Sequence, residues 1–283
     1  MRLKDALTRA VAKLATANVP SPRLNAETLL LFTLSCDRAY LYAHAEQELT
    51  ADELTRFDEA LAQRARGVPA QYITGHQEFW GLDLIVTPAV LVPRPETEHV
   101  VETALHIVAD NDLRHPRILD VGTGSGCIAL ALAKELQQAE MHASDLSAET
   151  LEIARANAAR LQLSDRIHFY QSDLLSDIPQ ELQFDLIVSN PPYVAERDAE
   201  SVEAQVRKFE PHHAVFAGET GMEVYRRLIP PARERLVAGG WLVMEIGAGM
   251  EEAVRELLAG WIEIGSVADL QGIPRVLAAR KSA

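Results

Sequence analysis

The segment from residue 117 onward alternates apolar runs with helical stretches, and this pattern constrains the fold more than any other feature. The runs RILDVG, EMHASD, RIHFYQSD and FDLIVSN are rich in apolar residues, and stretches with helical periodicity, such as AETLEIARANAARLQL, separate them. Strands buried on both faces read as continuous apolar runs, and parallel strands need crossover connections that are usually helical. The pattern therefore predicts an α/β fold with a doubly wound parallel sheet covered on both faces.

The C-terminal part predicts an antiparallel end to this sheet. A polar stretch (194–220) and a helix (221–238) precede a further strand, GGWLVMEIG, and another helix begins near Gly249. The segments WIEIGSVADL and RVLAARK are joined only by Gln271-Gly272-Ile273-Pro274. This connection is too short for a crossover helix, so the last two of seven strands should pair antiparallel.

The first ~70 residues carry apolar positions at helical spacing and predict a small helical bundle. Thr50 precedes Glu53 by three positions, which marks a helix start. Residues 71–93 alternate aromatic and β-branched residues around Gly75 and Gly81, which predicts a β-hairpin between two domains. Helical periodicity resumes over residues 93–110.

Charge and cysteine content restrict the partners and the compartment. Residues 1–75 hold nine Lys/Arg and nine Asp/Glu, so the formal net charge of −14 lies entirely in the rest of the chain. Such an acidic body repels free nucleic acid and accommodates a protein partner more easily. Cys36 and Cys127 form no C-x-x-C pair, which favours a reducing, cytoplasmic location. No apolar run approaches the ~20 residues that span a bilayer, so no membrane association is expected.

A glycine-rich loop, DVGTGSGCIAL (120–130), follows one predicted strand and opens a helix. Its glycines allow a sharp turn and close approach of a ligand, although G-x-G-x-G is one residue short of the dinucleotide fingerprint. A purely structural glycine turn is the alternative. Asp145 ends the next strand, where an acidic residue binds ribose hydroxyls in related folds.

Asp173 and Asn190 end the two following strands, and the carboxyl ends of a doubly wound sheet open onto one crevice. Asp145 or Asp173 alone is equally consistent with a helix N-cap, but the joint placement of these strand-ending residues favours a binding site. His212-His213 has no spacing that aims both side chains at one point, so it predicts a loop pair rather than a metal site.

Asn190-Pro191-Pro192-Tyr193 ends an apolar strand with a rigid corner that has few backbone donors. A simple strand terminator explains the prolines but not the asparagine or the tyrosine. The Asn190 side-chain oxygen and a proline carbonyl can accept the N–H groups of a planar –NH2 group, with Tyr193 packed against it. Such a corner suits attack by a neutral nitrogen on a sulfonium methyl, which needs alignment rather than prior deprotonation.

The N-P-P-Y corner and the G-x-G-x-G loop together resemble amino-group methyltransferases that use S-adenosylmethionine (SAM). More narrowly, the chain resembles the release factor glutamine methyltransferase family of HemK/PrmC type. N-P-P-Y alone is shared with DNA adenine and ribosomal RNA guanine methyltransferases, whereas F-W-G followed by P-R-P-E-T-E is more particular to this family. The matching stretches are PAQYITGHQEFWG (69–81), TPAVLVPRPETE (87–98), ILDVGTGSGCIAL (118–130), SDLS (144–147), IVSNPPYV (187–194), FEPHHAVFAG (209–218), GMEVYRRL (221–228) and DLQGIPRVL (269–277).

The resemblance implies a class I SAM-dependent methyltransferase fold with an added helical domain. Residues 1–74 would form a helical substrate-recognition domain, residues 75–92 a β-hairpin linker, and residues 93–283 the methyltransferase domain. The acceptor would be the glutamine of the Gly-Gly-Gln loop in class 1 peptide chain release factors, which becomes N5-methylglutamine. The rival readings are an amino-group methyltransferase acting on rRNA or DNA bases and a noncatalytic module.

The same resemblance implies roles for individual residues and no metal. Asn190, Pro191, Pro192 and Tyr193 would hold the substrate glutamine, with Asn190, Pro191 and Tyr193 catalytic. Leu174 stands where the family often has an aromatic residue, and no glutamine stands near Met250. The cofactor would contact Gly122, Thr123, Gly124, Ser125 and Gly126 along its methionine part, Asp145 at the ribose, Asp173 and Leu174 at the adenine, and Asn190.

Overall fold

The computed structural model of the protein describes residues 1–282 and divides into two compact units. The first unit comprises residues 1–76 and 203–209, and the second comprises residues 77–202 and the chain from residue 210 onward. Residues 203–209, which the sequence places within the second domain, thus belong structurally to the first unit. There Gln205 accepts a hydrogen bond from the buried guanidinium of Arg64 at 3.0 Å. Over residues 1–282, every helix is too short or too polar for a membrane span.

The first unit is a bundle of helices around a core of leucine, alanine and Phe57 side chains. The capping box predicted at Thr50 is confirmed, because the Thr50 hydroxyl accepts from the Glu53 N–H while the Glu53 carboxylate accepts from the Thr50 N–H. Arg64 also donates to Asn25 at 2.6 Å, which ties α4 to α2. The helices are α1 (Leu3–Thr16), α2 (Pro22–Leu34), α3 (Arg38–Ala43), α4 (Ala51–Ala65), α5 (Ala70–Thr74) and α9 (Ala204–Phe209).

A short hairpin, β1 (His76–Phe79) and β2 (Leu82–Ile85), follows the helical bundle along the chain. Trp80 and Gly81 form its two-residue turn with φ of 53° and 65°, the left-handed values of a type I′ turn. The predicted hairpin segment (71–93) is therefore longer than the observed pairing. The Asn157 side chain binds both backbone groups of Ile85, at 2.7 and 3.0 Å, and so replaces a further strand partner there.

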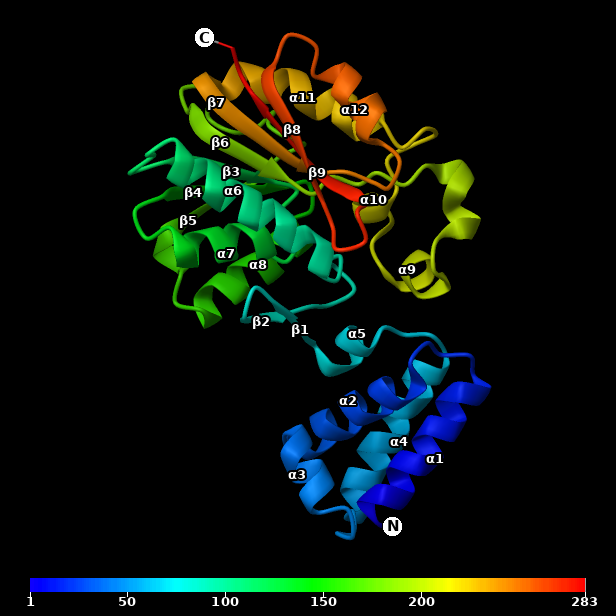
Figure 1. Cartoon of the computed structure of the whole chain (residues 1–283). Helices are drawn as coiled ribbons and strands as arrows, with labels where there is room; N and C mark the ends of the chain where they lie inside the picture. The colour runs from blue at the N-terminus through cyan, green and yellow to red at the C-terminus, as the bar shows by residue number, and fades with distance from the viewer. Residues whose placement is uncertain (283) are drawn as a thin grey trace. The chain divides into compact units, whose positions relative to one another are not determined.

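The second unit contains a seven-stranded sheet with strand order β5-β4-β3-β6-β7-β9-β8 (Figure 1). Neighbours from β5 to β7 pair parallel, whereas β9 pairs antiparallel with both β7 and β8, so the predicted doubly wound sheet with an antiparallel end is confirmed. The strands are β3 (Arg117–Val121), β4 (Glu140–Asp145), β5 (Ile167–Gln171), β6 (Phe184–Ser189), β7 (Leu236–Glu245), β8 (Ile262–Ala268) and β9 (Pro274–Arg280).

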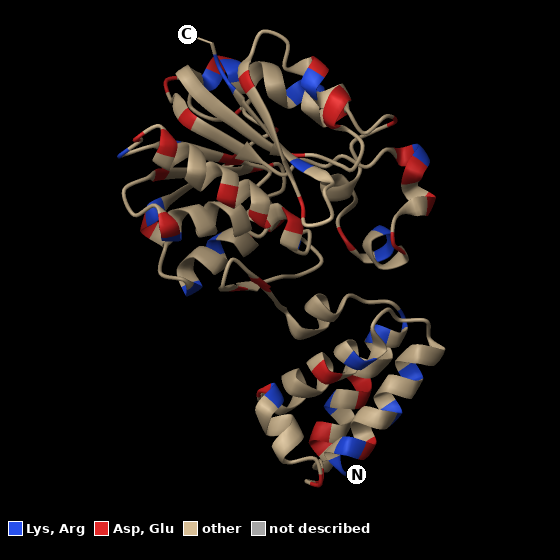
Figure 2. Cartoon of the chain, in the orientation of Figure 1, with Lys and Arg blue, Asp and Glu red and all other residues tan. Residues whose placement is uncertain are grey.

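Helices cover both faces of this sheet, and successive strand residues contribute to opposite cores. Ile118 belongs to the core under α6, α7 and α8, whereas Leu119 belongs to the core under α11 and α12. The helices are α6 (Glu98–Asp110), α7 (Cys127–Glu135), α8 (Ala148–Arg160), α10 (His212–Val215), α11 (Glu223–Arg235) and α12 (Glu251–Leu257), with 3₁₀ turns η1 (Pro95–Thr97), η2 (Ser164–Arg166) and η3 (Glu196–Ser201). Charged residues of both signs lie mainly on helices and loops, whereas the strands of the large sheet are mostly uncharged (Figure 2).

The strand order reverses between β3 and β6, because β3 continues to β4 on one side while β6 continues to β7 on the other. Loops that leave adjacent strands in opposite directions at such a point leave a crevice above the carboxyl ends of the strands. The glycine loop follows β3, and the N-P-P-Y corner follows β6. The topology therefore places the two sequence motifs on either side of one crevice.

Candidate active site

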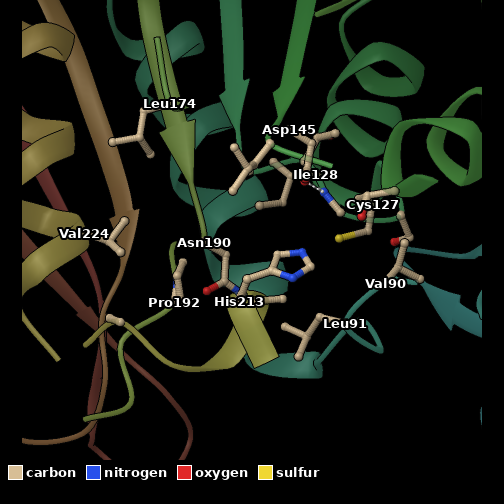
Figure 3. Close-up of a pocket in the computed structure, with 18 of the residues that line it drawn as sticks. Val90, Leu91, Cys127, Ile128, Asp145, Leu174, Asn190, Pro192, His213 and Val224 are labelled. Atoms are coloured by element: carbon tan, nitrogen blue, oxygen red, sulfur yellow. Dashed lines mark hydrogen bonds between the residues drawn. The ribbon is translucent and has the colours of Figure 1, made fainter. Parts of the chain in front are cut away.

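A cavity of about 360 Å³ opens in this crevice, within the volume range of small-molecule sites. The side chains of Asp145, Asn190 and His213 are directed into it from separate segments (Figure 3). The predicted site residues that line the cavity are Gly122, Thr123, Gly124, Ser125, Asp145, Asp173, Leu174, Asn190 and Pro192. Gly126, Pro191 and Tyr193 are not among its lining residues.

The three glycines of the loop after β3 serve different purposes. Gly122 and Gly124 have φ of 73° and 57°, and a Cβ at either would meet nothing within 4 Å, so both leave room for a ligand. A Cβ at Gly126 would lie 3.0 Å from Leu130 Cδ1 of α7 and 3.4 Å from Ala154 Cβ of α8, so this glycine allows the start of α7 to pack closely against α8. Gly126 is also the N-cap of α7.

Asp120, a site residue without an individual prediction, binds two backbone or side-chain groups of this loop and of α7. Its Oδ2 accepts from the Thr123 hydroxyl at 2.6 Å and from the Ala129 N–H at 3.2 Å. Complete burial raises the pKa of Asp120 to about 7, and the two hydrogen bonds oppose that rise. In the sequence, Asp120 could have been found as an acidic residue among the apolar residues of β3.

Asp145 lines the cavity and is not the N-cap of the following helix. Its Oδ2 accepts from the Gly124 N–H at 3.0 Å, and its Oδ1 accepts from the Ser147 N–H at 3.0 Å. The N-cap of α8 is Ser147, whose side chain accepts from Thr150. Burial raises the pKa of Asp145, while the two backbone N–H groups favour its charged form. Each oxygen keeps a lone pair for a further donor in the cavity.

Asp173 and Leu174 line another part of the cavity wall. Asp173 forms an ion pair with Arg227 of α11 at 2.6 Å, and no helix begins at Asp173, so it is not a helix cap. Leu174 has a φ of 56° and its carbonyl accepts from the Ser144 hydroxyl at 3.2 Å. Leu174 lines the cavity with this left-handed backbone geometry and lies at its margin in Figure 3.

The N-P-P-Y corner divides its side chains between the cavity and the core. Asn190 and Pro192 line the cavity, whereas Pro191 is buried and Tyr193 packs against the core under α11. The Tyr193 hydroxyl donates to Glu245 at 3.4 Å. Asn190 Nδ2 donates to the Thr97 hydroxyl at 3.0 Å. The packing of Tyr193 against the substrate stays a prediction, and in the structure its side chain lies between the core and Glu245.

The chain matches known proteins over nearly its whole length. Residues 5–75 match the PrmC N-terminal domain, and residues 103–209 match the methyltransferase small domain. The release factor glutamine methyltransferase of Koribacter versatilis is 55% identical, with 99% of both chains covered. That of Moorella thermoacetica is 43% identical, covering 91% of this chain and 89% of its own. The chain belongs to the release factor glutamine methyltransferase family.

The predicted class I SAM-dependent methyltransferase fold is confirmed as well. A methyltransferase structure from Pyrococcus furiosus, 19% identical, superposes with a TM-score of 0.51 over 83% of this chain and 100% of its own. The cavity of this family member fits a nucleoside cofactor, because Gly122 and Gly124 leave open backbone beside the buried carboxylate of Asp145. The predicted enzyme class, a SAM-dependent methyltransferase, follows from the family and the fold together.

The histidine pair of this methyltransferase separates in the structure. His213 lines the cavity, whereas His212 stacks on Phe216 and contacts Glu196 at 3.3 Å. Across residues 1–282, no group of three or more His, Cys, Asp or Glu side chains is arranged to hold a metal ion. Thr97, His213 and Glu245 are site residues without an individual prediction, although Thr97 and His213 lie in the P-R-P-E-T-E and F-E-P-H-H stretches.

Gly221 supports the N-P-P-Y corner of the methyltransferase from behind. It has a φ of 80°, and an added Cβ would lie 2.5 Å from the Tyr193 carbonyl oxygen. We expect Gly221→Ala to lower the free energy of unfolding by about 2–4 kcal/mol, through backbone strain and overpacking. Urea denaturation measures this loss. Gly272→Ala is the matched control, since Gly272 has a φ of 78° but open space around it.

The control isolates the contact with Tyr193. Gly272→Ala should show only the backbone penalty of about 1–2 kcal/mol. Equal destabilisation by the two variants would mean that the packing of Gly221 against the corner contributes nothing.

Proposed function

We propose that this enzyme transfers a methyl group from SAM to the side-chain amide nitrogen (N5) of the Gly-Gly-Gln glutamine in class 1 peptide chain release factors. One observation carries the proposal: the Asn190 amide, held through its Nδ2 by Thr97, lines the cavity that also contains Asp145. Its Oδ1 is then left to accept an N–H from a primary amide. The relatives named release factor glutamine methyltransferase support a glutamine as the source of that amide.

The cofactor site is proposed to run from the glycine loop to Leu174. Asp145 accepts hydrogen bonds from the ribose hydroxyls, and the open backbone at Gly122 and Gly124 accommodates the methionine part. Leu174 contacts the adenine by apolar packing rather than by aromatic stacking. When bound, SAM supplies an electrophilic methyl group on a positively charged sulfur.

The contribution of the chain to methyl transfer is orientation and electrostatics. Asn190 Oδ1 aligns the substrate nitrogen, and alignment of reacting atoms supplies several kcal/mol of barrier reduction. The same oxygen stabilises the positive charge that develops on the nitrogen during transfer. The substrate nitrogen loses its proton to water after it has gained the methyl group, so the corner needs no general base.

The helical unit is proposed to recognise the release factor. Its helix α2 exposes Leu24 and Phe32, which are 53% and 47% accessible and present apolar surface to a protein partner. We expect the double variant Leu24→Ser/Phe32→Ser to raise KM for the release factor several-fold while kcat at saturation stays unchanged. Steady-state methylation over a range of release factor concentrations measures both constants. An unchanged KM would remove α2 from the recognition surface.

The decisive experiment offers the enzyme two classes of substrate. Purified enzyme is incubated with methyl-labelled SAM and either a class 1 release factor or total RNA and DNA. Label in the release factor, located by mass spectrometry on the Gly-Gly-Gln peptide and lost when that glutamine is replaced by alanine, is expected. Label only in nucleic acid would instead establish the rival base methyltransferase. Absence of SAM binding by calorimetry would establish the noncatalytic reading.

A further inference from the structure

A chain of hydrogen bonds runs from the cavity to a buried carboxylate that the proposed reaction does not itself use. Asn190 Nδ2 donates to Thr97 Oγ1 at 3.0 Å, and Thr97 Oγ1 donates to Glu245 Oε2 at 2.6 Å. The other oxygen of Glu245 accepts from the Tyr193 hydroxyl at 3.4 Å. Glu245 is 3% exposed and ends β7, while Thr97 ends the turn η1. Three segments distant in sequence therefore meet behind the Asn190 amide.

The protonation state of Glu245 determines which group donates and which accepts in each of these hydrogen bonds. An ionised carboxylate only accepts, so the single hydrogen of Thr97 must point toward Glu245. Thr97 can then only accept from Asn190, which turns the amide nitrogen toward Thr97 and the amide oxygen toward the cavity. A protonated Glu245 can donate to Thr97 instead, and Thr97 can then donate to the Asn190 oxygen.

We propose that Glu245, acting through Thr97, is a positioning residue that keeps the carbonyl oxygen of the Asn190 side chain directed into the cavity. This inference rests on the proposed function in assigning that oxygen to the substrate amide. Loss of the carboxylate charge, or of the Thr97 hydroxyl, lets the Asn190 amide occupy both orientations. In the reversed orientation an NH2 group faces the NH2 group of the substrate, and neither can accept.

The surroundings of Glu245 set this switch near neutral pH. Burial raises the pKa of Glu245 to about 7, with Glu96 adding to the rise, while Thr97, Arg275 and Tyr193 favour the ionised form. Arg275 is itself paired with Asp269 at 2.9 Å. Because a carboxyl group is ionised above its pKa, the Glu245 carboxylate and the productive orientation of Asn190 are populated above about pH 7 and lost below it. The titratable and charged groups that face Glu245 are Glu96, Arg275, Tyr193, Tyr225 and Cys127.

The kinetic test uses four forms of the enzyme on release factor and SAM. Thr97→Val, which keeps shape and removes the hydroxyl, should lower kcat roughly ten-fold, and Thr97→Ser should restore most of it. The kcat/KM of the unmodified enzyme should rise with pH through about 7. The kcat/KM of Glu245→Gln should be low and should not rise with pH in this range. The dissociation constant for SAM should remain unchanged in all four.

A second measurement needs no turnover. The side-chain ¹H–¹⁵N resonances of Asn190, identified by their loss in Asn190→Asp, should titrate with a midpoint near pH 7. Glu245→Gln and Thr97→Val should abolish that titration. If these resonances do not titrate, or if Thr97→Val keeps the kcat and pH profile of the unmodified enzyme, the inference is overturned. A titrating amide in an enzyme that leaves release factor unmethylated would overturn only the proposed function.

Discussion

Replacing Asn190 with alanine should lower kcat for release factor methylation by about 10²–10³-fold, the typical effect of removing one preorganised polar group at a reacting centre. The variant loses the amide that we propose both aligns the substrate nitrogen and stabilises its developing charge. The affinity for SAM should change less than about two-fold, because the glycine loop and Asp145 do not depend on Asn190. Single-turnover methylation gives the rate, and calorimetry gives the affinity.

A matched asparagine outside the cavity provides the control for this prediction. Asn111 is the C-cap of α6, where its side chain donates to the Ile107 carbonyl at 2.8 Å, and Asn111→Ala should keep the kcat of the unmodified enzyme. A drop in SAM affinity equal to the drop in rate for Asn190→Ala would contradict the substrate-binding assignment of Asn190. It would instead place that side chain against the cofactor.

Replacing Asp145 with alanine should have the opposite pattern, weakening SAM binding by about 10- to 100-fold, the usual cost of lost hydrogen bonds to a charged group. The variant loses the carboxylate that we propose binds the ribose hydroxyls, and it also loses the bond to the Gly124 N–H that shapes the glycine loop. The methylation rate at saturating SAM should fall far less than for Asn190→Ala. Calorimetric titration with SAM, and with its product S-adenosylhomocysteine, measures the loss.

Asp145→Asn sharpens the same test. Both carboxylate oxygens accept from backbone N–H groups, those of Gly124 and Ser147, so an amide must turn its NH2 group toward one of these donors. We therefore expect Asp145→Asn to weaken SAM binding nearly as much as alanine does. Asp110→Ala removes an exposed acid at the end of α6 and controls for the change in net charge. Unchanged SAM affinity in both Asp145 variants would exclude this carboxylate from the cofactor site.

The strand-ending polar residues were predictable because sheet topology brings them together regardless of side-chain detail. Asp145 and Asn190 follow separate parallel strands, and the carboxyl ends of such strands share one edge of the sheet. Tyr193 was not predictable in the same way. Its contact with Glu245 depends on how the end of β7 packs beside the corner, which local spacing does not specify.

The groups that hold Asn190 could not be predicted from the sequence for a related reason. Thr97 lies 93 residues from Asn190 and 148 residues from Glu245 along the chain, yet one hydroxyl joins the two side chains. The spacing of apolar residues along the chain does not predict a contact over such a separation. Glu245 was visible only as an acid at the end of an apolar strand, and Asp120 only as an acid within one.

The sequence by itself determined the alternation of strands and helices, the antiparallel end of the sheet, and the motifs at the strand ends. These follow from local spacing, because burial on one or two faces and the length of a connection are properties of neighbouring residues. The tertiary structure alone decided that residues 203–209 join the helical unit and that Asn190, Thr97 and Glu245 form one hydrogen-bonded chain. Such pairings depend on how separate elements pack, and burial in that packing also raises the pKa of Glu245.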